Sequence, residues 1–509
     1  MTLAWLILIP LFGGLAAWLA SVVSANLCRW TTVGTLVLLT AQCLNLLTEE
    51  NTGAWMAAES HPWIPQIGAN LSFAVDGISL LLVLISILLS LVAVLVSWKT
   101  VDTRIGAFHF NILWVLSGVL GVFLATDLFL FFFAYELMVI PMYFLIAFWG
   151  DRKAGAAATK FILYTQASGL VMLAAIFGLY ALHGKATGDY TFAYDALAAF
   201  RTDHPMAPWL MAGFFFAFAV KLPIFPFHGW QPDAYTHAPT AGSIILAGFL
   251  GKTGAYGLVR FVLPIFEQQL ATLTPLIATL AVITLFYGAM LAFAQRDIKR
   301  LIAYSSLGHM GFVMLGILAG TFQSLQGVMV MLLSHGFVTA ALFAMAGMLE
   351  TRTRGIRDME RMGGLWKQIP VFSTLMLVLV LISLGIPGGG NFVAEILILI
   401  GSFGPLAGWT IAALVGLIVP AVYSLWLIQR AFHGQPRETH ALTDLDAREK
   451  TLIGALVVVL LWIGLFPSTI LQTGAPALAL VEADPVPPPA LTAEPGPLLA
   501  GDLPDSRHP

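Results

Sequence analysis

Long runs of apolar residues, separated by short polar stretches, extend along most of this chain. A helix that crosses the hydrocarbon core of a bilayer needs about 20 largely apolar residues. Runs of this kind predict fourteen spans, at 2–20, 30–48, 77–97, 107–126, 128–149, 160–183, 206–227, 240–263, 270–294, 299–320, 325–349, 369–402, 406–429 and 451–472. No Lys or Arg precedes the first run, so we expect a retained span there rather than a signal peptide. The pattern predicts an all-α polytopic membrane protein.

Two of the predicted spans carry residues that interrupt a helix. Lys221-Leu-Pro-Ile-Phe-Pro226 ends the run at 206–227, and Gly385-Ile-Pro-Gly-Gly-Gly-Asn391 lies in the middle of 369–402. Because proline removes a backbone donor and glycine loosens the helical turn, we expect both spans to be broken. Interrupted spans at corresponding positions of two halves are typical of a transporter site.

The spacing of charged residues indicates an internal repeat. Lys221 and Glu395 are 174 residues apart and Glu136 and His309 are 173 apart, although the first prolines of the two interruptions are only 164 apart. This predicts an inverted repeat of five helices. The chain then divides into N-terminal spans at 1–106, a first repeat at 107–265, a second repeat at 266–430, a loop and last span at 431–473, and an extended, proline-rich periplasmic tail at 474–509.

Basic residues are distributed unevenly between the two sides of the predicted bundle. Of the 24 Lys and Arg residues, eighteen fall in loops on one side, four fall on the other side and two lie within spans. Loops rich in Lys and Arg stay in the cytoplasm. This rule places the first side in the cytoplasm and both termini in the periplasm.

The composition excludes several classes of protein. Apolar residues make up 59% of the chain and charged residues only 10%, too few to cover a soluble protein of 509 residues or to keep it disordered. A net charge of −3 gives no reason to expect a nucleic-acid partner. Cys28 and Cys43 are the two cysteines, and their spacing encodes neither an iron–sulfur nor a zinc site.

Four ionisable side chains lie within the predicted spans: Glu136, Lys221, Lys252 and Glu395. A charge at the centre of a membrane helix costs about 2.5–3.5 kcal/mol. Structural salt bridges are one explanation, but a buried ion pair is often no more stable than an apolar replacement. Burial disfavours the charged forms of both lysine and glutamate, which favours proton exchange between them near neutral pH. We therefore interpret them as a proton or ion path.

Two histidines extend this interpretation. His309 and His335 lie in consecutive predicted spans, between Lys252 and Glu395 in chain order. An imidazole passes a proton between its two nitrogens near neutral pH, although each histidine alone is equally well explained as a packing residue. The pair favours a relay. Three further histidines receive no role from the sequence: His109, His228 and His237.

Several motifs resemble the antiporter-like subunits of proton-translocating NADH:quinone oxidoreductase, respiratory complex I. They are Phe-Phe-Ala-Tyr-Glu136-Leu-Met, Val-Lys221-Leu-Pro, His-Gly-Trp-Gln-Pro-Asp233-Ala, Ala-Pro-Thr-Ala-Gly and Asp297-Ile-Lys-Arg-Leu-Ile-Ala-Tyr-Ser-Ser-Leu-Gly-His309-Met-Gly-Phe. The resemblance covers roughly residues 70–430. Glutamate in Pro-Gly-Gly-Gly-Asn-Phe-Val-Ala-Glu395 is similar to the M-type subunit, since the L- and N-types have lysine there.

The resemblance implies a path of residues for protons. Glu136 and Lys221 would form a coupled pair at one end, Lys252, His309 and His335 would connect centrally, and Glu395 would end the path. It also implies that this chain holds no cofactor or metal. Flavin, iron–sulfur clusters and quinone would belong to partner subunits, among them neighbouring antiporter-like subunits.

The function expected from this resemblance is proton transfer from cytoplasm to periplasm in the bacterial inner membrane, driven by electron transfer from NADH to quinone in other subunits. Two alternatives within the same fold remain: a subunit of a multisubunit cation/proton antiporter, or of a membrane-bound hydrogenase. A third alternative is a haem-bearing membrane anchor with His309 and His335 as axial ligands.

Overall fold

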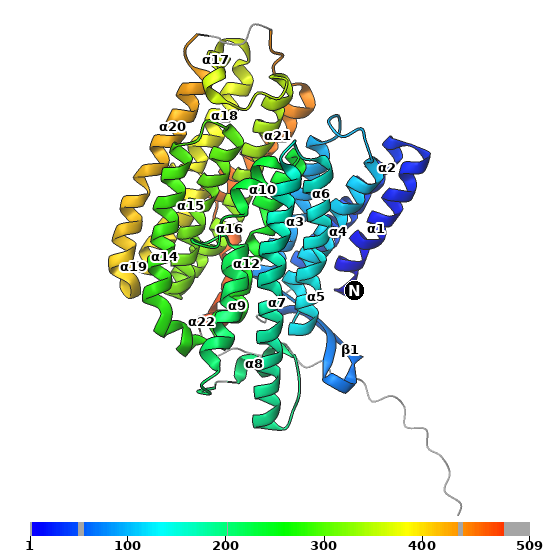
Figure 1. The fold of residues 1–509 in the computed structure, drawn as a ribbon, viewed down its shortest axis with the longest axis vertical. Coiled ribbons are helices and arrows are strands. Elements are labelled where there is room, and N and C mark those ends of the chain that lie inside the picture. Colours follow the sequence, from blue (N-terminus) through cyan, green and yellow to red (C-terminus); the bar gives the residue numbers. More distant parts are fainter. Residues whose placement is uncertain (1–2, 49–54, 201, 436–440, 483–509) are drawn as a thin grey trace, which may run out of the picture.

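Long helices run side by side through the molecule, as the computed structural model shows (Figure 1). The structure describes residues 3–48, 55–200, 202–435 and 441–482. The helices up to residue 265 are α1 (Ala4–Val23), α2 (Ala25–Thr48), α3 (Gly77–Val96), α4 (Ile105–Leu124), α5 (Leu128–Leu137), α6 (Val139–Trp149), α7 (Ala154–Thr187), α8 (Tyr194–Ala199), α9 (Ala207–Lys221), α10 (Gln231–His237), α11 (Thr240–Ile245), α12 (Lys252–Gly257) and α13 (Leu263–Ile265).

The remaining elements complete the bundle. The later helices are α14 (Glu267–Phe293), α15 (Ile298–Ala319), α16 (Phe322–Arg352), α17 (Leu365–Gln368), α18 (Pro370–Ser383), α19 (Gly390–Gly416), α20 (Ile418–Phe432), α21 (Ala447–Leu465) and α22 (Ser468–Glu482). Two π-helical turns, η2 (Leu246–Leu250) and η3 (Leu258–Val262), join α11, α12 and α13. Two 3₁₀ turns are η1 (Pro65–Ile67) and η4 (Met359–Arg361).

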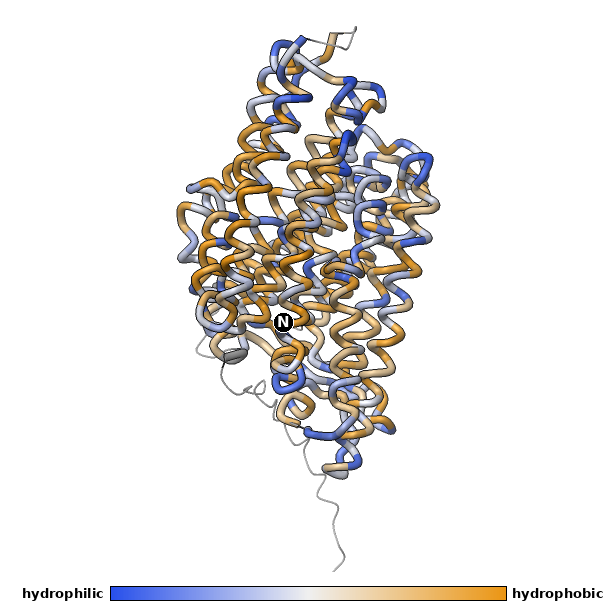
Figure 2. Tube along the Cα trace, turned by 60° about the vertical axis from the view of Figure 1, so that its left-hand side comes forward, coloured by the Kyte–Doolittle hydropathy of each residue, from blue (hydrophilic) through white to orange (hydrophobic). Residues whose placement is uncertain are grey.

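The apolar helices form a hydrophobic band across the middle of the molecule that can span a membrane. Hydrophobic residues fill the middle of the molecule, and hydrophilic residues gather towards its two ends (Figure 2). Within the described residues, eleven helices are long and apolar enough to cross a membrane, or twelve if α21 and α22 form one bent span. The number falls short of fourteen because α9 and α18 are short apolar helices and because the stretch Gly390–Phe432 counts as one.

Both predicted interruptions are present. α9 ends at Lys221, and ten residues later the chain resumes as α10; α18 ends at Ser383 and α19 begins at Gly390. A further break follows Pro405, where Leu406 has non-helical backbone angles of φ −132° and ψ 38°. Pro405 removes a backbone donor from the helix, which accounts for this kink.

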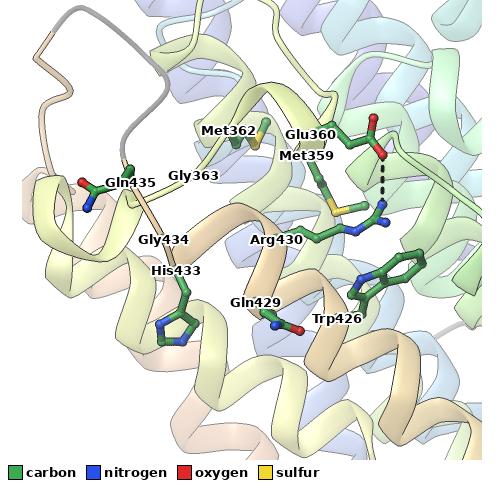
Figure 3. A pocket seen from close by; sticks show the side chains of 10 residues that line it. All are labelled: Met359, Glu360, Met362, Gly363, Trp426, Gln429, Arg430, His433, Gly434 and Gln435. Atoms are coloured by element: carbon green, nitrogen blue, oxygen red, sulfur yellow. Dashed lines mark hydrogen bonds and ion pairs between the residues drawn. The ribbon is translucent and has the colours of Figure 1, made fainter.

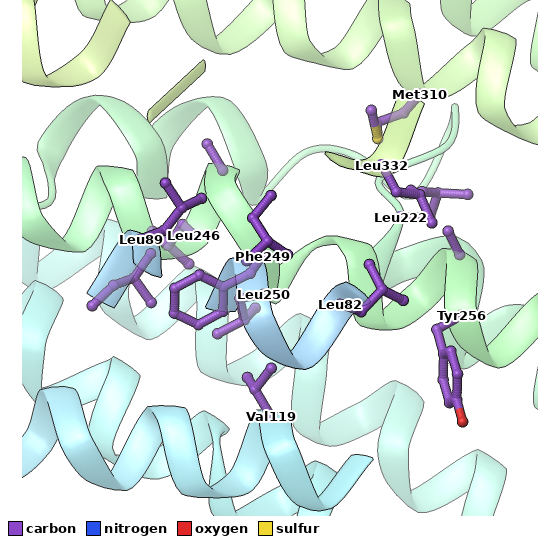
Figure 4. Packing of buried hydrophobic residues seen from close by; sticks show 14 of the residues in the cluster. Leu82, Leu89, Val119, Leu222, Leu246, Phe249, Leu250, Tyr256, Met310 and Leu332 are labelled. Atoms are coloured by element: carbon purple, nitrogen blue, oxygen red, sulfur yellow. The ribbon is translucent and has the colours of Figure 1, made fainter. Parts of the chain in front are cut away.

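The core lies around α16 and the segment Thr240–Ile265. The most apolar stretch of each is completely buried. Figure 4 shows side chains of this core, where Leu82 and Leu89 of α3 and Val119 of α4 pack near Phe249 and Leu250 of η2. A span with no lipid-facing side can carry polar groups along its length, provided that neighbouring helices supply their partners.

The apolar pattern does not predict a two-stranded hairpin between α2 and α3. β1 (Trp55–Ile64) pairs antiparallel with β2 (Ala69–Asp76), and Ser60 lies opposite Ser72. Glu59 accepts a hydrogen bond from the backbone N–H of Ala4, 2.7 Å away, at the beginning of α1. The hairpin therefore holds the N-terminus of the first helix.

The prediction of an extended tail from residue 474 is wrong for its first part. α22 runs through Ser468–Glu482 and packs against α3 and α16, and Gly474 is buried there. Alanine and leucine continue an apolar face beyond Gly474, so the helix buries enough surface to form despite Pro476. Residues 483–509, the rest of the predicted tail, lie outside the described part of the chain.

Candidate functional site

Glu136 lies in the last turn of α5, directly before the break that separates α5 from α6. The side-chain amide of Gln166 on α7 donates a hydrogen bond to its Oε2. Its Oε1 is buried and has no hydrogen-bond partner among the described residues. Glu136 is thus held by a neutral group, with one carboxylate oxygen left to receive a proton or a cation.

Lys221 is the last residue of α9, and its side chain is completely buried. The Nζ atom has no hydrogen-bond partner in the described structure. It lies over the ring of Tyr135, 4.8 Å from the centroid, and over the ring of Phe161 at 5.7 Å. Aromatic faces and the carboxyl end of a helix both favour a positive charge.

The structure does not join Glu136 and Lys221 in an ion pair. Gln166 occupies one side of the carboxylate, whereas Lys221 Nζ lies against Tyr135, the residue that precedes Glu136. The pair inferred from the resemblance therefore stays a prediction. What the structure adds is that both groups carry an unused polar atom in the same buried region.

Glycines bring α12 close to the end of α9. A side chain at Gly254 would collide with the backbone of Phe218 and Leu222, on either side of Lys221. The indole N–H of Trp230 donates to the Val220 carbonyl at 2.8 Å, which satisfies a group that the broken helix leaves free. This close approach places the end of α9 against the first turn of α12, where Lys252 begins the helix.

We expect Gly254→Val to lower both proton pumping and the melting temperature of the assembled complex, because overpacking costs typically 1–3 kcal/mol. Gly155→Val is the matched control, since no atom lies within 4 Å of a Cβ there. Equal effects of the two substitutions would show that the contact of α12 with α9 is unimportant.

Lys252 and His335 are in direct contact. Lys252 Nζ lies 2.9 Å from His335 Nδ1, and it also donates to the Ala247 carbonyl in the π-helical turn η2. A π-helical turn leaves carbonyls displaced from their usual α-helical partners, and such turns are frequent at functional sites. His335 Nε2 is buried and has no hydrogen-bond partner among the described residues.

His309 connects His335 to Glu395. The two imidazole rings are 5.2 Å apart between centroids, and His309 Nε2 lies 3.8 Å from Glu395 Oε1. His309 Nδ1 is 2.9 Å from the Ser305 carbonyl, and Nε2 is 3.2 Å from the Ser383 carbonyl. Lys252, His335, His309 and Glu395 therefore form one continuous buried line.

The break between α18 and α19 supplies polar groups to this line. Ser383, the last residue of α18, offers its carbonyl to His309 Nε2 and to the Asn391 amide, the latter at 3.3 Å. Ser334 on α16 in turn donates to the Asn391 side-chain oxygen at 2.7 Å. The interruption that the sequence predicts thus positions His309 and Asn391 through the backbone carbonyl of Ser383 that it exposes.

The sequence reasoning did not identify Gln166, Ser383 or Asn391 as part of the site. Gln166 was recognisable as an amide within the apolar run 160–183, and Asn391 as the residue that ends the glycine-rich interruption. Ser383 acts through its backbone carbonyl, and no side-chain pattern reveals that.

The structure separates the three unassigned histidines from the line. His237 Nδ1 lies 2.8 Å from Asp151, outside the spans, whereas the Nδ1 atoms of His109 and His228 have no hydrogen-bond partner among the described residues. Asp127 near a span end is a helix cap: it accepts hydrogen bonds from the backbone N–H groups of Phe129 and Leu130.

An ion-pair cluster at one end of the bundle fixes α10, the helix after the first break. Arg357 contacts Asp151 at 3.0 Å and Asp297 at 2.9 Å, and it donates to the Thr236 carbonyl of α10. Burial alone would raise the pKa of Asp151, but hydrogen bonds from His237 and the backbone and the charge of Arg357 lower it to about 2. Asp151 therefore stays ionised at neutral pH and keeps the cluster together.

A polar pocket of about 520 Å³ lies at the ends of α20 and η4 (Figure 3). Arg430 Nη1 lies 3.4 Å from Glu360 Oε1, and its guanidinium stacks 3.4 Å above the ring of Trp426. None of the predicted site residues lines this pocket. Its charges are already paired with each other.

Single substitutions of the relay histidines should have a limited effect. We expect His309→Ala or His335→Ala to slow coupled pumping by at most about thirtyfold, because a bridging water costs about 0–2 kcal/mol. NADH-driven acidification by the assembled complex measures this. A complete loss in either variant would show that water does not replace the imidazole.

Known proteins resemble this chain over most of its length. Residues 125–419 match the family model described as NADH:quinone oxidoreductase/Mrp antiporter, transmembrane. The chain is 46% identical to NADH-quinone oxidoreductase subunit M of Pseudomonas aeruginosa, over 94% of this chain and 97% of that protein. It is 45% identical to the subunit M of Escherichia coli strain K12, over 95% and 98%.

Solved structures resemble the fold over nearly its whole length. A chain of respiratory complex I from Thermus thermophilus with bound NADH has a TM-score of 0.86 and 30% identity, covering 94% of this chain and 99% of that one. A chain of the Mrp complex from Dietzia sp. has a TM-score of 0.83 at 23% identity, covering 95% and 98%. The second likeness concerns the fold alone.

Proposed function

This chain belongs to the family of transmembrane subunits shared by NADH:quinone oxidoreductases and Mrp antiporters, and we propose that it carries protons through the series of ionisable residues from Glu136 to Glu395. It is a membrane subunit of an NADH-quinone oxidoreductase and works together with other subunits of respiratory complex I. The redox chemistry of NADH and quinone takes place in those partners under this proposal.

The observation that carries the proposal is the contact series across the second half of the bundle. Lys252 Nζ is 2.9 Å from His335, the rings of His335 and His309 are 5.2 Å apart between centroids, and His309 is 3.8 Å from Glu395. Each of these four side chains can gain or lose a proton, and all are buried where lipid or apolar residues surround the bundle. Packing alone gives no reason for four adjacent titratable groups.

The hydrogen-bond partners define how a proton would be held. A carbonyl oxygen only accepts, so His309 donates to the Ser305 or the Ser383 carbonyl when one ring nitrogen carries a proton, and to both only while the ring is fully protonated. His335 Nδ1 faces the Lys252 ammonium and therefore acts as an acceptor. A proton leaving Lys252 has His335 as its nearest titratable acceptor, and Glu395 lies 3.8 Å from His309 to receive a proton from it.

Under this proposal, protons move along the line only after the charge of Glu136 or Lys221 changes at its other end. Bringing a charge towards Lys221, or removing one, is worth several kcal/mol at the low effective dielectric of a buried site. Moving one elementary charge against a potential of 100 mV costs about 2.3 kcal/mol. A change in the Glu136 and Lys221 charges is therefore large enough to move a proton onward to Lys252.

We also propose fourteen spans, inverted five-helix repeats and periplasmic termini. Two short apolar helices, α9 and α18, each stand before a break, and Leu406 divides the stretch Gly390–Phe432, which supports the higher number of spans. The excess of Lys and Arg on one side supports the orientation.

A subunit of a cation/proton antiporter is the second candidate. The similarity to the Mrp complex supports the fold alone, whereas relatives at 45% and 46% identity over nearly the whole chain are subunits of NADH-quinone oxidoreductase. Copurification of this chain with a flavin- and iron–sulfur-containing assembly is expected, and its isolation with cation/proton exchange activity but without such an assembly would favour the antiporter.

The function is tested by Glu395→Gln in the assembled complex in closed vesicles. We expect NADH-driven acidification to fall about hundredfold, because the amide cannot accept the proton from His309. Glu360→Gln serves as the control, since Glu360 pairs with Arg296 and Arg430 outside the spans. Unchanged acidification in Glu395→Gln with normal subunit content would refute the relay.

A further inference from the structure

An apolar groove runs along the outside of the bundle between α3 and α21. It has a volume of about 580 Å³. Leu88, Leu91 and Leu95 form the wall on α3, and their spacing places them on one helical face. Ala455 and Leu456 belong to the opposite wall on α21, and other groove residues are Val92, Phe337, Ala447, Arg448, Thr451, Leu452 and Val459.

Arg448 stands at one end of this groove as its charged member. Its Nη1 donates to the Leu95 carbonyl at 2.8 Å, in the last turn of α3, which fixes the guanidinium at the mouth of the groove. Its Nε is buried without a hydrogen-bond partner among the described residues. Asp446, two residues before Arg448 in the chain, is paired with Lys99 at 3.2 Å. Arg448 therefore brings a positive charge to the groove that forms no ion pair with a described residue.

Aromatic residues place this end of the groove at a membrane interface. Trp98 follows α3 directly, and it packs against Trp30 with the ring centroids 5.3 Å apart. Arg29 lies over the Trp98 ring at 5.7 Å. Tryptophan and arginine are typical of the level where lipid headgroups lie, and Arg448 contacts Leu95, only three residues before Trp98.

The dimensions of the groove fit a lipid chain. The lining residues of α21 run from Ala447 to Val459, which is about 18 Å of helix. One leaflet of the hydrocarbon core is about 15 Å thick. A helix about 10 Å in diameter would need roughly 1,400 Å³ over that length, so a whole helix does not fit inside, whereas an extended acyl chain does.

We propose that this groove binds one phospholipid with an anionic headgroup, with its acyl chain between α3 and α21 and its phosphate on Arg448. The positive charge of Arg448 favours an anionic headgroup over a neutral one. The lipid would fill the space between the last span and the core helices.

The test uses the assembled complex in nanodiscs made of equal parts of phosphatidylglycerol and phosphatidylcholine. We expect a cryo-EM map to show acyl-chain density in the groove with a headgroup at Arg448. Mass spectrometry of the lipids retained after detergent washing should show phosphatidylglycerol, and Arg448→Gln should weaken that retention about tenfold because it removes a charged donor.

Two pairs of variants distinguish a loss of lipid binding from a general loss of stability or assembly. Ala455→Trp, which fills the groove from an exposed position, should remove the density, whereas Val458→Trp on the same helix should not. Lys450→Gln removes an exposed charge outside the groove and should retain the lipid. An empty groove, a protein helix of a neighbouring subunit within it, or equal retention of phosphatidylcholine would overturn the proposal. None of these residues belongs to the proton path, so failure here leaves the proposed function unaffected.

Discussion

Replacing Lys221 with alanine is expected to abolish proton pumping and to lower quinone-linked NADH oxidation in the same complex. Lys221 is completely buried at the end of α9, and its Nζ has no hydrogen-bond partner in the described structure. Without it, a proton must cross this region unaided. A charge at membrane depth costs about 2.5–3.5 kcal/mol, which corresponds to a rate roughly a hundredfold lower.

The measurement is NADH oxidation and acidification recorded together in closed vesicles, with subunit content checked on a native gel. Lys153→Ala is the control, because Lys153 is exposed at the beginning of α7, outside the buried line. Normal oxidation together with normal pumping in an assembled Lys221→Ala complex would contradict the relay. Loss in both variants would point to assembly instead.

The second large effect is expected at Glu136, where charge should matter more than shape. Glu136→Gln keeps the volume of the side chain and a carbonyl that still accepts from Gln166, but removes the negative charge. Lys221 then loses the group that favours its protonated form, and we expect pumping to fall about tenfold or more. Glu136→Asp keeps the charge with a shorter reach and should retain substantial activity.

A packing or hydrogen-bonding role predicts the opposite order. The isosteric glutamine would then be tolerated, and the shorter aspartate would lose the contact with Gln166 on α7. Both variants are compared in assembled complexes by the ratio of protons moved to NADH oxidised. An active glutamine variant beside an inactive aspartate variant would leave Glu136 as a structural residue.

The sequence by itself determined the class of the protein and which ionisable residues lie within its apolar spans. Twenty apolar residues in a row have no stable place in water, so the runs specify membrane helices whatever their neighbours are. Proline and glycine act on the local backbone, so the breaks after Lys221 and before Glu395 were predictable and are present. Charged residues within the spans stood out because burial makes each of them costly.

Only the tertiary structure decided which of these residues meet. The contacts of Lys252 with His335 and of His309 with Glu395 join residues 83 and 86 positions apart in sequence, and no local pattern encodes such pairings. The same holds for Gln166 beside Glu136 and for the Ser383 carbonyl beside His309. The hairpin of β1 and β2 and helix α22 also depend on distant surfaces, since their short apolar faces become stable only against the rest of the bundle.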